Sequence, residues 1–305
     1  MPQIKRGNEP VSIQRRKDLA LLIYLVVTSQ PHSRDILATL FWQEESQSLA
    51  RSNLRKSLSR LKALLGQDAL LGSQDQVGLN PELPVQLDVR EFQVRYQQFR
   101  DHHGRNPGRP VLCAVCQKSI EEAAALYQAD FLEGFSLPDS SVFDEWQFFQ
   151  LEGLRQNLAE ILEQLTKQYL ERGELSGAIA SCRRWLALDK LHEPAHRQLI
   201  LLYALNGQPE AAKRQFEECT RLLAEELQSK PEPETLQLFE DIRRKKLSGP
   251  RKFQTEIQKG EIASTILPEK NHHVLPSYPS PFLGREKELE DITRLLLEPS
   301  CHMLT

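Results

Sequence analysis

The chain has 305 residues, of which 40% are hydrophobic and 27% charged, with a formal net charge of −3. This composition excludes wholesale disorder, and the length allows two domains and the start of a third. Five cysteines are too few for a disulfide scaffold of this size, and their odd number leaves one unpaired. We therefore expect a reducing, cytoplasmic location.

The charge is unevenly distributed along the chain. Residues 1–66 contain eleven Lys and Arg against five Asp and Glu, a formal +6, so the remainder carries −9. A basic head on an acidic body is typical of a protein whose head alone meets a polyanion such as nucleic acid.

The first predicted element is a helix over residues 15–30, which ends before Pro31. Its apolar run, Leu19–Val27, follows three cations and so resembles a signal peptide. Asp18 interrupts the junction, however, and no small-residue cleavage site follows. The run is also too short to cross a bilayer, so we expect a buried helix and no membrane partner. Arg15, Arg16 and Lys17 could contact DNA phosphates or be ordinary surface charge.

Two further helices and a hairpin complete the head. Ser33 is placed to cap a helix over residues 34–42, in which Ile36, Leu37, Leu40 and Phe41 have helical spacing. A third helix is predicted from 48 to 65, ending at Gly66, with one buried stripe formed by Leu54, Leu58, Leu61 and Leu65. Residues 69–79 read as a hairpin around Ser73-Gln74-Asp75. Three helices followed by a hairpin predict a winged helix-turn-helix domain over residues 1–84.

From Asp88 the pattern changes to long amphipathic helices, among them residues 113–129 and 140–172. Leu165, Tyr169, Gly173 and Ala178 recur 34 residues later as Leu199, Tyr203, Gly207 and Ala212. This period is typical of tetratricopeptide repeats, in which Gly lies in the turn and Ala allows close approach of helices. The expected fold is therefore mainly α, a winged helix-turn-helix head followed by a tetratricopeptide-like helical-repeat domain over residues 85–247.

The third predicted helix carries the candidate DNA-binding residues. At 100° per residue, the side opposite the leucine stripe presents small hydroxyl side chains and cations. Short side chains permit close approach to a major groove, while Arg and Lys reach phosphates or guanine edges. We expect Arg51 and Arg60, at the borders, to hold phosphates and the residues between them to read bases. The candidate residues are Ser48, Arg51, Ser52, Arg55, Lys56, Ser59 and Arg60. A merely solvated basic face is the alternative.

Cys113 and Cys116 form a C-x-x-C pair downstream of His102 and His103, which invites a zinc hypothesis. The spacing fits no common zinc finger, and the cysteines share a predicted helical turn with Leu112 and Val115. We therefore favour apolar packing cysteines and expect no metal and no other cofactor. The chain has no phosphate loop, no G-x-S-x-G and no H-E-x-x-H, so we expect no enzymatic activity.

Several motifs, in order, resemble a known family. They are Arg16-Lys17, Pro31-His32-Ser33-Arg34, Leu40-Phe41-Trp42, residues 50–58 (ARSNLRKSL), 87–92 (LDVREF), 126–132 (LYQADFL), 193–196 (EPAH), 223–227 (LAEEL) and 231–235 (PEPET). These resemble the Streptomyces antibiotic regulatory protein type of transcriptional activator, with its winged helix-turn-helix and bacterial transcriptional activator domain. Family members usually begin with several strands, whereas only Met1–Ile13 precede the first helix here, so that sheet is short or lost.

The C-terminal part differs in character. Residues 248–281 contain five prolines and read as a linker. Phe282-Leu283-Gly284-Arg285-Glu286 resembles the opening box of a signal-transduction ATPase, so residues 282–305 would be the truncated start of such a domain.

The family resemblance implies a sequence-specific regulator, an activator in most members, that binds double-stranded promoter DNA and contacts RNA polymerase, with a homodimer possible in principle. The alternatives are a tetratricopeptide-like interaction scaffold without DNA binding, or the N-terminal fragment of a larger ATP-dependent regulator.

Overall fold

The computed structural model describes residues 2–6, 9–104 and 112–244. Its first part contains the three expected helices, α1 (Arg16–Thr28), α2 (Arg34–Phe41) and α3 (Gln47–Leu65). Ser33 caps α2 by accepting a hydrogen bond from the backbone N–H of Asp35, as predicted. Gly66 ends α3 with a φ of 112°, a conformation that L side chains rarely adopt.

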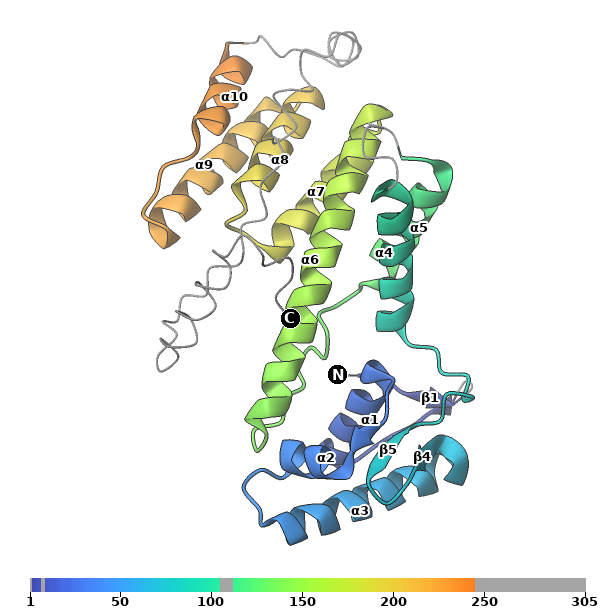
Figure 1. Ribbon diagram of the computed structural model, residues 1–305. Helices are drawn as coiled ribbons and strands as arrows, with labels where there is room; N and C mark the ends of the chain where they lie inside the picture. Colours follow the sequence, from blue (N-terminus) through green and yellow to red (C-terminus); the bar gives the residue numbers. More distant parts are fainter. Residues whose placement is uncertain (1, 7–8, 105–111, 245–305) are drawn as a thin grey trace, which may run out of the picture. The chain divides into compact units, whose positions relative to one another are not determined.

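A small antiparallel sheet completes the winged helix (Figure 1). The expected hairpin is β4 (Leu70–Gly72) and β5 (Gln76–Leu79), and a short third strand, β3 (His32–Ser33), pairs with β5 to give the order β3-β5-β4. Ahead of α1, β1 (Lys5–Arg6) and β2 (Glu9–Pro10) form a two-stranded ribbon. The expected N-terminal sheet is thus present in short form.

Side chains from all three helices and the sheet form the core of the head. Leu21, Leu25, Leu37, Phe41, Leu54, Leu61 and Leu70 are fully buried. Ile36 was expected on the same apolar face of α2, but it is 58% exposed. Its position one residue ahead of Leu37 turns it out of the core, because Leu37, Leu40 and Phe41 already fill the inward side of this two-turn helix.

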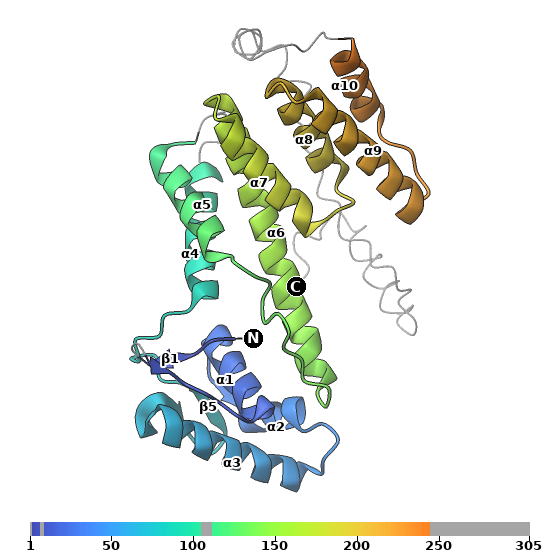
Figure 2. The ribbon, with the colours of Figure 1, turned by 180° about the vertical axis from the view of Figure 1, so that it is seen from behind.

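The body consists of helices that stack in sequence order (Figures 1 and 2). The helices are α4 (Asp88–Gly104), α5 (Ala114–Leu126), α6 (Ser141–Glu171), α7 (Leu175–Leu188), α8 (Glu193–Leu205), α9 (Pro209–Glu226) and α10 (Pro233–Arg243). The helix predicted over 140–172 is unbroken. The mainly α fold with a winged head and a helical-repeat body is confirmed.

The predicted 34-residue repeat is also visible in the turn geometry. Gly173 and Gly207 have φ angles of 75° and 70°. In each turn the next backbone N–H donates to the carbonyl of the repeat tyrosine, Glu174 to Tyr169 and Gln208 to Tyr203, both at 2.8 Å. The Ala178 and Ala212 side chains are completely buried between helices. The residues 34 positions apart therefore have the same turn geometry, hydrogen bond and burial in α6–α7 and in α8–α9.

The start of α6 packs against the head. Phe143 is fully buried, and its ring centroid lies 5.6 Å from that of Phe41 in α2. Trp146 contacts Tyr24 of α1 at 4.9 Å, and the Ser140 hydroxyl donates to the carbonyl of Leu40. Aromatic side chains of the body thus extend the apolar core of the head.

The linker (248–281) and the ATPase-like box (282–286) lie outside the described residues. Within the described part of the chain, no helix combines the length and the apolar composition needed to cross a bilayer.

Candidate nucleic-acid interface

Helix α3 presents two contrasting faces. Ala50, Leu54, Leu58 and Leu61 are buried against the rest of the head. The opposite side is open to solvent: Ser48, Arg55, Lys56 and Ser59 are exposed and Ser52 is half-buried. The predicted separation of a leucine stripe from a small polar face is therefore confirmed for Leu54, Leu58 and Leu61, whereas Leu65, in the last turn, is half-buried.

Arg55 and Lys56 are the cations best placed to meet a ligand. Both side chains are exposed, and no ion pair to an acidic residue is found for either within the described part of the chain. The serines on the same face, Ser48, Ser52 and Ser59, have short side chains, so a partner can approach the helix closely. A helix of 19 residues is about 28 Å long and of a diameter that B-DNA admits in its major groove.

Arg51, on one border of this face, pairs with a residue of α2. Its guanidinium donates to both carboxylate oxygens of Asp35, at 2.5 and 2.6 Å. The hydrogen bond from Arg51 holds the pKa of Asp35 below its ordinary value. Both side chains are about half exposed, so the pair fixes the direction of Arg51 while leaving it accessible.

Arg60, on the other border, has a structural partner that the sequence did not indicate. Two guanidinium nitrogens donate to Asp18 of α1 at 2.6 and 2.7 Å, and one also donates to Ser57 at 3.0 Å. The Asp18 side chain is 5% exposed, whereas that of Arg60 is 37% exposed. Arg60 therefore neutralises the buried carboxylate of Asp18. A contact between Arg60 and a DNA phosphate would be a second role of the same side chain.

The cations at the start of α1 face the body. The Lys17 ammonium lies 3.4 Å from a carboxylate oxygen of Asp139, and the Arg16 guanidinium lies 5.5 Å from the ring centroid of Phe135. Both side chains thus help to seat α1 on the segment before α6. This geometry favours the surface-charge alternative over phosphate contact for these two residues.

The wing is held by α2 and contains no cation. Arg34 at the start of α2 donates from its backbone N–H to the carbonyl of Asp75 and from Nε to that of Ser73. The Ser73 hydroxyl in turn accepts from the backbone N–H groups of Asp75 and Gln76. These bonds fix the hairpin beside α3, so the wing frames the helix rather than adding positive charge.

Lys62 was missed by the sequence analysis. It is half-buried and lies seven residues after Arg55, which at 100° per residue returns it to within about 20° of the same direction. Lys62 therefore lies on the same side of the exposed face as Arg55. The seven-residue spacing from Arg55 was the available signal in the sequence.

Comparisons with known proteins agree with this architecture. Residues 87–243 match the family described as bacterial transcriptional activator domain. The regulatory protein AfsR of Streptomyces griseus is 26% identical over 243 residues, which cover 78% of this chain and 23% of that protein. The chain therefore spans about a quarter of the length of that relative.

A solved structure shares the fold. The structure of Mycobacterium tuberculosis EmbR in complex with a low-affinity phosphopeptide has a TM-score of 0.61 at 22% identity, covering 86% of this chain and 68% of the EmbR chain. The family resemblance found in the sequence is thus confirmed, and its domain match extends over more than half of the chain. The chain belongs to the bacterial transcriptional activator domain family.

Proposed function

We propose that this chain is a sequence-specific DNA-binding regulator of transcription that reads double-stranded promoter DNA with α3. The observation that carries the proposal is the exposed face of α3, where Arg55 and Lys56 stand among small serines and have no acidic partner among the described residues. In this reading the serines permit close approach and the two cations reach base edges. Arg51, directed by Asp35, contacts phosphate.

The other partners follow from family membership and stay proposals for this chain. RNA polymerase is the expected target of an activator, and pairing of two chains on repeated half-sites would make the protein a homodimer on DNA. We also propose that the chain is not an enzyme and acts in the cytoplasm. The helical body would carry the contacts to these partners, since repeat helices offer long continuous surfaces.

The test combines selection with mutagenesis. Binding sequences are selected from a pool of random duplexes with the full chain, and affinities for the selected duplex and a scrambled duplex are measured at several salt concentrations. Arg55→Ala and Lys56→Ala should each weaken binding to the selected duplex by about 1–3 kcal/mol, roughly 5- to 150-fold, and affect the scrambled duplex much less. Arg51→Ala should weaken both duplexes alike and make the salt slope shallower by about one.

Arg214→Ala is the matched control, because Arg214 is an exposed arginine on α9 in the body. It should leave both affinities and the salt slope unchanged. If Arg55→Ala and Lys56→Ala behave like the control, α3 is not the reading helix. If the wild-type chain binds no duplex in a salt-dependent manner, the interaction-scaffold alternative is favoured instead.

A further inference from the structure

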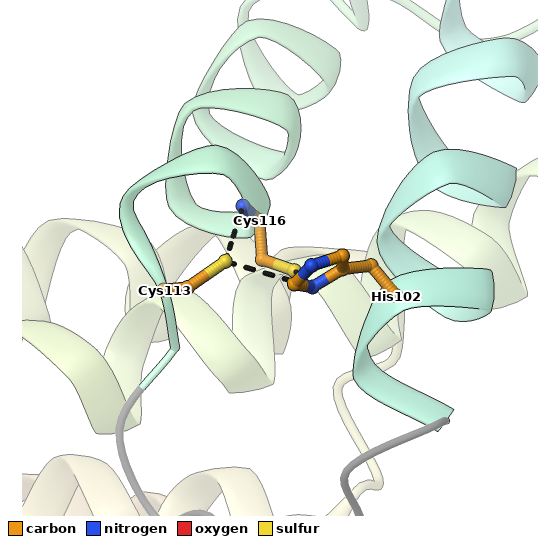
Figure 3. Close-up of side chains that lie close together, drawn as sticks. All are labelled: His102, Cys113 and Cys116. Atoms are coloured by element: carbon orange, nitrogen blue, oxygen red, sulfur yellow. Dashed lines mark hydrogen bonds between the residues drawn. The ribbon is translucent and has the colours of Figure 1, made fainter.

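Three metal-ligand side chains meet at the hairpin formed by α4 and α5. His102 lies at the end of α4, Cys113 caps the start of α5 and Cys116 lies in its first turn (Figure 3). The imidazole Nδ1 of His102 is 3.1 Å from Sγ of Cys116 and 3.6 Å from Sγ of Cys113. All three ligand atoms lie within 4.8 Å of one another. Cys113 and Cys116, which follow His102 by eleven and fourteen residues, thus place their sulfur atoms next to its imidazole.

These separations suit a tetrahedral cation. With Zn–S bonds of about 2.3 Å and Zn–N bonds of about 2.0 Å, the ligand atoms of a tetrahedral site lie roughly 3.5–3.8 Å apart. The observed Nδ1–Sγ distances of 3.1 and 3.6 Å are close to this range, and the two sulfurs lie within 4.8 Å of each other, so side-chain rotations would bring the three atoms into position around an ion. Two thiolates and one imidazole are also a donor set that zinc prefers.

The two cysteines of the cluster differ in burial: Cys116 is buried, whereas the surroundings of Cys113 differ from those of a packing residue. Cys182 and Cys219 are completely buried within helices of the repeat, as apolar cysteines usually are. Cys113 is half-buried at a helix cap, and Val115, expected to share its apolar face, is 66% exposed. Cys113 is therefore less buried than the sequence analysis expected, because α5 begins one residue later than predicted and leaves Cys113 at the cap.

A hydrogen bond supports Cys113 as a ligand. The backbone N–H of Cys116 donates to Sγ of Cys113 at 3.4 Å. Such a bond orients the sulfur and stabilises negative charge on it, as outer hydrogen bonds do in metal sites. The exposed His102 places the third donor at the solvent side of the cluster, where water can supply a fourth ligand.

We propose that His102, Cys113 and Cys116 form a binding site for a thiophilic divalent cation of the Zn²⁺ type, with water in the fourth position. Binding replaces the two thiol protons, which are released to solvent, with two metal–sulfur bonds. The bound ion ties the end of α4 to the start of α5. Because His102 is accessible, the ion enters and leaves without unfolding of the body.

The experiment uses the full chain, treated with a chelator and a reductant, under anaerobic conditions. Co²⁺ is titrated as the probe, since its visible bands report tetrahedral geometry and its sulfur-to-metal charge-transfer band reports thiolate ligands; Zn²⁺ is then added in competition. We expect one Co²⁺ per chain, with both signatures, and its complete displacement by one equivalent of Zn²⁺. Addition of Zn²⁺ should also raise the temperature at which α5 unfolds, because the ion binds the folded state.

Three variants separate the site from general effects on folding. His102→Gln changes an exposed side chain and should weaken Zn²⁺ binding at least about tenfold. Cys116→Ser should remove the charge-transfer band or halve it, while Cys182→Ala, a buried cysteine outside the cluster, should bind as the wild type does. Circular dichroism confirms that each variant is folded.

Three results would overturn the proposal. One is the lack of a charge-transfer band in the folded, reduced chain at tenfold excess of Co²⁺. Another is wild-type affinity in both His102→Gln and Cys116→Ser. The third is a Cys113–Cys116 disulfide that forms in air even in the presence of equimolar Zn²⁺, which would identify the pair as a redox couple.

Discussion

Replacing Arg60 by Ala is expected to destabilise the head, although Arg60 lies on the helix proposed to bind DNA. The change removes both hydrogen bonds to Asp18, whose side chain is 5% exposed. Removing one partner of a fully buried ion pair costs about 3–5 kcal/mol, because the remaining charge is neither solvated nor paired. Arg60 is itself 37% exposed, so water can enter the space it leaves. We therefore expect a smaller loss, about 2–3 kcal/mol.

Hydrogen exchange is the suitable assay because it reports the head separately from the body. A loss of about 2–3 kcal/mol should accelerate exchange of the buried amides of α1 and α3 roughly 30- to 150-fold. Arg55→Ala, on the exposed side of the same helix, is the control and should stay within about 0.5 kcal/mol of the wild type. In the Arg60→Ala background, Asp18→Asn should recover part of the loss, because a neutral amide is less costly to bury than a carboxylate. Equal exchange in Arg60→Ala and Arg55→Ala would refute this reasoning.

Two further pairs of substitutions test the architecture through urea unfolding followed by circular dichroism. Phe143→Ala should lower stability by about 3–5 kcal/mol, because the ring is fully buried against Phe41. Phe148→Ala on the same helix, where the ring is 55% exposed, should change it by less than about 1 kcal/mol; similar losses in both would contradict the packing described. Gly207→Ala should destabilise by about 1–2 kcal/mol because the residue has a φ of 70°. Gly153→Ala, in α6 with open space around the new methyl group, should stabilise the protein by up to about 1 kcal/mol. If both glycine variants change the stability in the same direction, the positive φ of Gly207 is not the cause of the loss.

The elements that the sequence predicted well are those specified by local signals. Ser33 before α2, Gly66 after α3 and the leucines of α3 each act within a few residues of their own position. The repeat was equally accessible, since Tyr169 and Tyr203 recur at a fixed offset and hold the same turn bond. For the same reason, the outward face of α3 could be derived from helical periodicity alone.

The features that were missed depend on partners distant in sequence. Arg60 and Asp18 are 42 residues apart, and a border position on a helix does not reveal which neighbour it faces. β3 consists of two residues whose strand conformation depends on pairing with β5. The sequence analysis did weigh His102 together with the C-x-x-C pair and set zinc aside, because the spacing alone did not show that α4 and α5 bring these side chains together.

The division into head and body is less sharp in space than in sequence. Helix α6 supplies Leu165 and Tyr169 to the first repeat, and its opening turn places Phe143 and Trp146 against Phe41 and Tyr24 of the head. A helix of 31 residues is about 46 Å long and unbroken here. Because α2, which carries Phe41, also holds Arg51 through Asp35, the body is connected to the exposed face of α3 by continuous packing.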